Sequence, residues 1–78
     1  MTYIELMGRV CPRIRSERER LDCNKKDVAM ALGYGLSVYA SYETKTLPSL
    51  DRLVEMADYF GCSADYLLGR TDKREVVK

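Results

Sequence analysis

The fold is decided by residues 24–43, which read NKKDVAMALGYGLSVYASYE. Asn24 is a strong N-cap, because its side chain can bond to a free N–H group of a first helical turn, and Asp27 is placed to bond back to it. Gly33 is a natural helix stop. The stretch therefore predicts a helix that begins at Asn24 and ends before Gly33. The buried stripe of this helix consists of Val28, Ala29 and Leu32.

A second helix is expected over residues 36–43, and only two residues separate it from Gly33. So short a connection makes two helices cross steeply, as in a helix-turn-helix unit. Tyr39 and Tyr42 fall on the inward face of the second helix, so we expect them in the core rather than stacked on bases.

Upstream lies a charged helix over residues 12–21. It opens at Pro12, which suits a first helical position because its missing N–H has no partner there. Ile14, Arg18 and Leu21 share one face at helical spacing. The remaining Arg and Glu residues alternate, and we expect them to form a solvated surface with local ion pairs.

The two ends of the chain are expected to lie outside the central domain. Residues 1–11 form a short N-terminal extension with a helical stripe of apolar residues, which Pro12 interrupts. We expect this extension to be helical and to kink or break between Gly8 and Pro12. Residues 71–78 are polar, and we expect them to fray as a C-terminal tail.

Two more helices are expected downstream. One begins near Ser49 and ends at Gly61, and a shorter one runs from a cap at Ser63 to Gly69. No alternation of apolar and polar residues is long enough to predict a strand. The sequence therefore predicts one all-α domain over residues 12–70.

The composition of the 78-residue chain argues against several classes of protein. There is no His, and the three cysteines (Cys11, Cys23 and Cys62) are spread singly, so we expect no metal site and no cofactor. An odd number of cysteines without a signal peptide indicates reduced thiols in the cytoplasm, with Cys23 and Cys62 in the core. No apolar run approaches the roughly 20 residues that span a membrane. No nucleophile and base can be paired, so we expect neither an enzyme nor a small-molecule substrate.

The net charge limits how the chain can bind nucleic acid. Thirteen Lys and Arg against twelve Asp and Glu give a net charge of +1, whereas many DNA-binding domains are clearly basic. Any contact with DNA must therefore depend on local clusters of positive charge.

The order of these signals is similar to that of a known family. Residues 13–72, about three-quarters of the chain, resemble the Cro/repressor-type (Xre) helix-turn-helix domain of bacterial and phage regulators. The most specific element is the closing run ADYFGCSADYLLGR at residues 57–70. The other matching positions are Ala29, Leu32-Gly33, Tyr42-Glu43 and Pro48-Ser49-Leu50.

The resemblance implies a lambda-repressor-like bundle of five short helices, with a reading unit over residues 24–43 whose second helix lies in the major groove. It implies a sequence-specific transcriptional repressor, of a prophage, mobile element or bacterial chromosome, that binds double-stranded DNA as a homodimer. It also implies an ion pair between Arg18 and Glu43 with a structural role; the alternative is two ordinary surface charges. The candidate dimer surfaces are the end of the last helix and the apolar residues Tyr3, Ile4, Leu6, Met7 and Val10.

Phosphate contacts are implied on both sides of the reading helix. Lys25 aligns with the family's contact at the N-terminus of the preceding helix, with Lys26 beside it, where the helix dipole and free N–H groups also attract anions. Tyr34, in the turn, is placed to reach a phosphate. The loop after the reading helix is one residue shorter than in relatives and lacks their Gly. Its phosphate candidates are Thr44, Lys45 and Thr46. The alternatives are a solvated lysine pair and a simple polar loop.

The base-reading positions implied by the family are Leu36, Ser37, Val38 and Ser41. Relatives carry long polar side chains there that match base edges, whereas serine does not select between bases. Leu36 and Val38 suit either thymine methyl groups or an apolar patch for a protein partner. The second option leaves a rival hypothesis open: a protein-interaction module, such as an antitoxin or antirepressor, with weak or no base reading.

Overall fold

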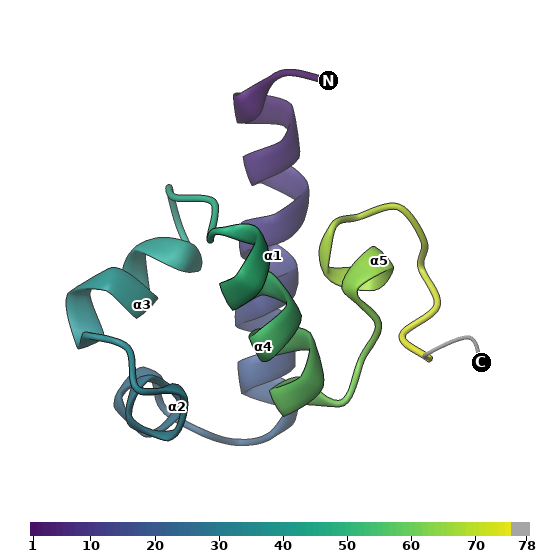
Figure 1. Ribbon diagram of the computed structural model, residues 1–78. Helices are drawn as coiled ribbons and strands as arrows, with labels where there is room; N and C mark the ends of the chain where they lie inside the picture. Colours follow the sequence, from purple (N-terminus) through teal and green to yellow (C-terminus); the bar gives the residue numbers. More distant parts are fainter. Residues whose placement is uncertain (76–78) are drawn as a thin grey trace.

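The computed structural model describes residues 1–75 and is all-helical over that range (Figure 1). Its helices are α1 (Tyr3–Arg20), α2 (Lys25–Leu32), α3 (Leu36–Tyr42), α4 (Leu50–Phe60) and α5 (Ala64–Leu67). The expected all-α class and the five-helix order are therefore confirmed. Within the described residues, no helix is both long enough and apolar enough to cross a membrane.

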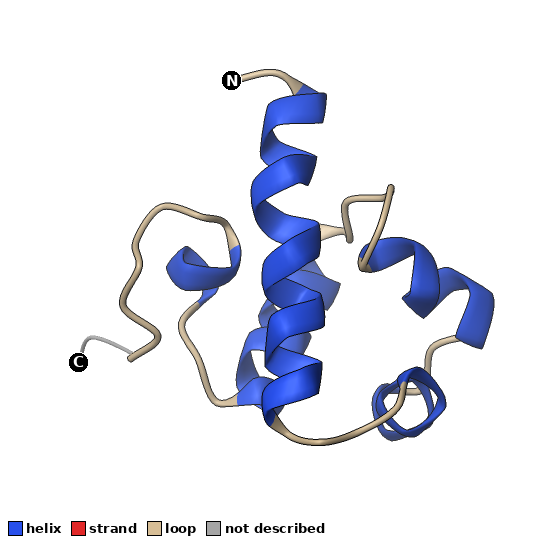
Figure 2. Cartoon of the chain, turned by 180° about the vertical axis from the view of Figure 1, so that it is seen from behind, coloured by secondary structure: helices blue, strands red, loops and turns tan. Residues whose placement is uncertain are grey.

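The helices are arranged around α1, the longest of them (Figures 1 and 2). Both views place α2 and α3 on one side of α1, and α5 with the C-terminal segment on the other. α2 contacts α3 and α4, whereas α5 contacts α1 and α4. The two helices of the reading unit therefore lie together at one edge of the molecule.

The reading unit begins and turns as its capping residues predict. The Asn24 side chain accepts a 2.8 Å hydrogen bond from the Asp27 N–H and so caps α2. Gly33 ends α2 with a φ of +77°, a left-handed conformation that glycine adopts without a steric penalty. Only Tyr34 and Gly35 then precede α3, as expected.

The core is formed by apolar side chains from every helix. Tyr39 and Tyr42 are both buried, which confirms their predicted inward position. Cys11 and Cys62 are buried, and Cys23 is half-buried against the core, all as free thiols. The largest fully buried apolar side chains are Tyr39, Phe60, Ile14, Met56 and Leu67.

α1 is one unbroken helix, so the prediction of a helix that starts at Pro12 after a break is wrong. The helix begins with a capping box, in which the Thr2 side chain accepts from the Glu5 N–H and the Glu5 carboxylate accepts from the Thr2 N–H. Pro12 removes only one backbone hydrogen bond, and burial of Val10 beside it helps to offset that loss. Residues 3–11, expected as a helical extension of the domain, are therefore the first half of α1.

The charges of α1 are not all solvated, contrary to the prediction from their alternation, because Glu17 is only 1% exposed. Its carboxylate is paired with Arg20 on the same helix and with Arg74 in the C-terminal segment. Residues 71–75 are therefore held on the fold, and the prediction that they fray is wrong. The rest of the expected tail, residues 76–78, lies outside the described residues.

Candidate nucleic-acid interface

The far end of α3 is fixed to α1 by a buried carboxylate. Glu43 is the C-cap of α3, and its side chain is 1% exposed. Arg18 donates to it twice, from Nε to Oε2 at 2.7 Å and from Nη2 to Oε1 at 3.1 Å. The remaining Nη1 of Arg18 donates to the Cys23 carbonyl at 2.9 Å. The structure thus places the pair implied by the family resemblance, and the two-pronged geometry sets the orientation of α3 as well as its distance from α1.

Tyr39 completes this buried cluster. Its hydroxyl donates a 2.6 Å hydrogen bond to Glu43 Oε2. Burial, followed by the hydrogen bond to Glu43, raises the pKa of Tyr39, so the phenol stays protonated. The hydrogen bond to Glu43 also raises the pKa of Arg18, more than burial lowers it. Glu43 therefore keeps three side-chain hydrogen bonds, and α3 has a rigid support.

Tyr34 lies in the turn between α2 and α3 but points into the fold. It is 9% exposed, and its hydroxyl donates a 2.9 Å hydrogen bond to Glu55 on α4. Its ring lies 4.3 Å from the guanidinium of Arg52 and edge-on to Tyr42. Burial and the hydrogen bond to Glu55 raise the pKa of Tyr34 to about 12. The expected phosphate contact does not fit this position, because the hydroxyl is already engaged inside the fold, and we leave Tyr34 out of the interface.

Three of the four expected base-reading residues are exposed on the first turn of α3. Leu36 and Val38 are 50% and 44% exposed, and Ser37 between them is also exposed. Ser41 is half-buried, and its hydroxyl donates a 2.6 Å hydrogen bond to the Val38 carbonyl. That bond uses the only proton of the hydroxyl, which leaves Ser41 as an acceptor toward any base. The part of α3 that is open to solvent is therefore its first turn, at Leu36, Ser37 and Val38.

The remaining phosphate candidates lie before and after α3 in the chain. Lys25 and Lys26 form the exposed start of α2, where helical N–H groups lack intrahelical partners. Thr44 and Lys45 are exposed in the loop after α3, and Thr46 is half-buried. No ion pair within residues 1–75 engages these lysines. Within the described residues, the charges of these lysines are therefore available to contact a negatively charged ligand.

The loop between α3 and α4 turns without glycine. The N–H groups of Thr44, Lys45 and Thr46 all donate to the Ser41 carbonyl, at 3.1, 2.8 and 2.9 Å. None of these residues takes a positive φ. Convergence on one carbonyl replaces the left-handed cap that Gly commonly supplies, which explains how the shorter loop closes.

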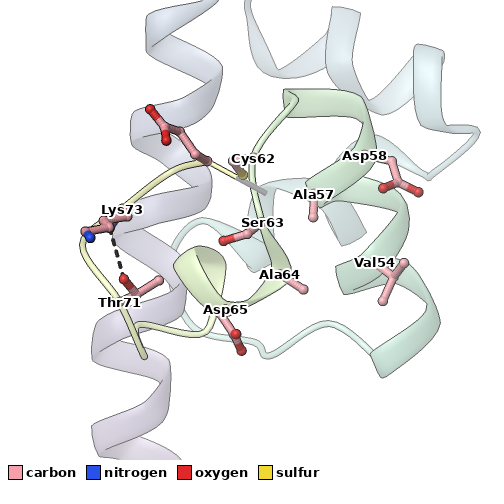
Figure 3. Close-up of a pocket in the computed structure, with 10 residues that line it drawn as sticks. Val54, Ala57, Asp58, Cys62, Ser63, Ala64, Asp65, Thr71 and Lys73 are labelled. Carbon is pink, nitrogen blue, oxygen red and sulfur yellow. Dashed lines mark hydrogen bonds between the residues drawn. The ribbon is translucent and has the colours of Figure 1, made fainter. Parts of the chain in front are cut away.

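A depression of about 530 Å³ opens elsewhere on the molecule (Figure 3). It is bordered by α4, α5 and the C-terminal segment, with Val54, Ala57, Asp65 and Lys73 in its wall. None of the described residues that line it comes from α2 or α3. The depression is therefore separate from the exposed surface of α3.

Two residues make supporting contacts that the sequence did not predict, and one of them, Tyr3, was expected only as a candidate dimer residue. Arg52, whose guanidinium lies over the ring of Tyr34, donates a 2.8 Å hydrogen bond from Nη1 to the Tyr42 hydroxyl. The Tyr3 hydroxyl accepts a 3.0 Å hydrogen bond from the Leu47 N–H. Arg52 had no local signal, because Tyr34 and Tyr42 lie 18 and 10 residues earlier in the chain. Tyr3 had no local signal, since its partner lies 44 residues away.

Comparison with known proteins gives independent information about the chain. Residues 14–67 match a family model described as Helix-turn-helix. Over 63 residues the chain is 36% identical to a Bacillus subtilis (strain 168) protein named as the uncharacterized HTH-type transcriptional regulator YobD. The match covers 80% of this chain and 56% of that relative, so the chain spans little more than half of the relative's length. No solved structure matches the chain significantly.

Proposed function

This chain belongs to the Helix-turn-helix family, and we propose that it is a sequence-specific regulator of transcription that inserts α3 into the major groove of double-stranded DNA. The observation that carries the proposal is that α3 is open at its first turn and held at its far end by Arg18 and Glu43. A reading helix needs both properties, because base contacts depend on side chains in fixed positions. The resemblance to Cro/repressor-type domains supports the role of a repressor, which acts by occupying its site.

The charges around α3 support a phosphate-binding role. Lys25 and Lys26 sit at the positive end of the α2 dipole, and Lys45 lies in the loop that follows α3. In the proposed complex these lysines contact backbone phosphates, with the Thr46 hydroxyl as a further donor. The Thr44 hydroxyl donates to the Ala40 and Ser41 carbonyls at 3.4 Å, so it must turn away from them to reach a phosphate. Such contacts position the protein on DNA without selecting a sequence. Positive charge at both ends of the reading unit is what would let a chain of net charge +1 bind a polyanion.

Sequence preference would come from the first turn of α3. We assign Leu36 and Val38 to thymine methyl groups in the major groove, because apolar side chains distinguish thymine by that methyl. Ser37 can donate to or accept from a base edge, whereas Ser41 acts as an acceptor. Because Leu36 and Val38 would contact thymine methyl groups, we expect the protein to prefer DNA sites with thymine at the contacted positions.

We also propose that the protein binds as a homodimer in the bacterial cytoplasm. One reading unit contacts few base pairs, so two half-sites one helical turn apart are the usual way to reach useful affinity. Among the expected dimer residues, Ile4 is 74% exposed and remains a candidate contact, whereas Val10 is buried in the core. Sedimentation of the protein with and without a selected DNA site would measure the stoichiometry.

The test of DNA binding is a titration of labelled duplex DNA at several salt concentrations. We expect the association constant to fall with salt, with a logarithmic slope of about −0.9 for each phosphate contacted. Lys25→Ala and Lys45→Ala should each make the slope shallower by about 0.9. Lys73→Ala is the matched control, because Lys73 is exposed near α5, and its slope should equal that of the parent. No binding at low salt would contradict the proposal and favour a protein-interaction module.

The test of base reading begins with sites selected from random duplexes. Replacing one thymine of such a site by deoxyuracil removes only the methyl group. If Leu36 contacts that methyl, Leu36→Ala and the base change together weaken binding less than the sum of their separate free-energy losses. Additive losses at every thymine, for both Leu36→Ala and Val38→Ala, would remove these two residues from base reading.

A further inference from the structure

The loop between α3 and α4 is contacted by the first half of α1. The Leu47 N–H donates to the Tyr3 hydroxyl at 3.0 Å. Two turns further along α1, the Cys11 thiol donates to the Thr46 carbonyl at 3.7 Å. Figures 1 and 2 both show this loop beside the first half of α1. Two adjacent loop residues are thus bonded to one distant helix.

In the second half of this loop the Leu47 N–H is bonded to that helix, whereas the Ser49 carbonyl accepts a 2.8 Å hydrogen bond from the Leu53 N–H of α4. The first half is fixed by three N–H groups that donate to the Ser41 carbonyl. The Leu47 N–H instead has Tyr3 as its partner. Pro48 follows and has no N–H, and the Ser49 side chain makes no capping hydrogen bond to α4. The Tyr3 hydroxyl is therefore well placed to decide where this part of the loop lies.

We propose that the first half of α1, from Tyr3 to Cys11, is a brace that fixes the phosphate-contacting loop in its binding position, with Tyr3 as the positioning residue. This inference rests on the proposed function, in which Lys45 contacts a phosphate. A loop that is already held in place loses less conformational freedom on binding, so more of the contact energy appears as affinity. Tyr3 is 55% exposed, so its hydroxyl adds little to the stability of the fold.

The experiment uses Tyr3→Phe, which removes the hydroxyl and keeps the ring. We expect the melting temperature to fall by only a few degrees, because one partly exposed hydrogen bond is lost and the fold stays intact at the temperature of the binding assay. Affinity for duplex DNA should fall about three- to tenfold, and the Leu47 amide should exchange with solvent faster by a similar factor. Tyr59→Phe is the matched control. Tyr59 is 37% exposed on α4, its hydroxyl has no hydrogen-bond partner within the described residues, and none of the three readouts should change.

A double variant separates positioning from a general structural effect. If Tyr3 acts through the loop, its hydroxyl matters less once Lys45 is gone. Tyr3→Phe combined with Lys45→Ala should therefore lose less binding free energy than the sum of the single variants. Additive losses, or unchanged affinity in Tyr3→Phe, overturn the inference. If the parent chain binds no DNA, the proposed function fails instead, and exchange of the Leu47 amide still decides whether Tyr3 fixes the loop.

Discussion

Glu17 and Arg74 lie 57 residues apart in the chain and form a two-pronged ion pair, in which the carboxylate is buried and the guanidinium is half-buried. Arg74 donates from Nε to Oε2 at 2.9 Å and from Nη2 to Oε1 at 2.5 Å. Arg20 also donates to Oε1, and both arginines donate to the Phe60 carbonyl at the end of α4. One buried carboxylate thus joins α1, α4 and the C-terminal segment.

Arg74→Ala should destabilise the fold by about 1–3 kcal/mol, because it leaves the Glu17 carboxylate buried with fewer hydrogen bonds. Urea unfolding followed by circular dichroism at neutral pH measures this loss. Lys73→Ala, at the neighbouring exposed position, should stay within about 0.5 kcal/mol of the parent. Equal stability of the two variants would show that the pair contributes nothing.

The pKa of Glu17 predicts how this contribution depends on pH. Burial alone would raise the pKa, but hydrogen bonds and charge from Arg74 and Arg20 outweigh it and hold the pKa below the ordinary value of 4.5. The unfolded chain then binds this proton more readily than the folded one, so the contribution is complete above pH 4.5 and is lost as pH falls through the lowered pKa. We expect the stability difference between the parent and Arg74→Ala to shrink in urea titrations at acid pH. A constant difference from neutral pH to about pH 3 would contradict an ionised Glu17.

Glu43→Ala should cost about 3–5 kcal/mol, because it leaves the nearly buried Arg18 guanidinium without its ion partner. Replacing both residues, as Arg18→Met with Glu43→Leu, should cost less than the sum of the single replacements. This double variant also keeps the test decisive if the single variant does not fold. Glu19→Ala serves as the control, since Glu19 pairs with Arg15 in the open, and its loss should stay below about 0.5 kcal/mol. Full additivity in equilibrium unfolding would rule out coupling between Arg18 and Glu43.

The same replacement at two glycines should act in opposite directions. Gly69 has a φ of +78°, and a Cβ there would lie 2.7 Å from the Arg9 Cβ, so Gly69→Ala should destabilise by more than about 1 kcal/mol. Gly8 lies inside α1 with nothing within 4 Å of an added Cβ, so Gly8→Ala should stabilise by about 0.5–1 kcal/mol. Thermal melts should therefore shift by several degrees in opposite senses. Shifts of the same sign would show that Gly69 and Gly8 do not differ in their need for glycine.

The sequence predicts the helix boundaries whose determinants are local. Asn24 and Gly33 act within four residues of their own positions, and both were predicted. A helix in the N-terminal extension was expected from its apolar stripe, but its cap was not, although Thr2 is followed three residues later by Glu5, the spacing of a capping box. Pro12 suits a first helical position, so a helix start was predicted there, but in the structure Pro12 lies inside α1.

The supporting contacts of the site depend on pairs that are distant in the chain. The periodicity of α1 cannot show that Glu17 is buried, because Arg74, which offsets the cost of burying its charge, comes from the C-terminal segment. Tyr34 turns inward because Glu55 and Arg52 of α4 meet it, which a reading of the turn alone cannot reveal. The contact between Arg18 and Glu43 was expected from family resemblance, not from spacing.

The projecting start of α1 has a practical consequence for anyone who purifies this protein. Tyr3 touches the loop that we propose meets phosphate, so an affinity tag fused before Met1 would place bulk and charge next to the DNA. The segment over residues 71–75 runs on the α5 side, away from α2 and α3 (Figure 1). A tag joined on the side of the segment that follows α5 is therefore the better choice for measuring binding, and a tag before α1 would itself report on how close α1 comes to the nucleic acid.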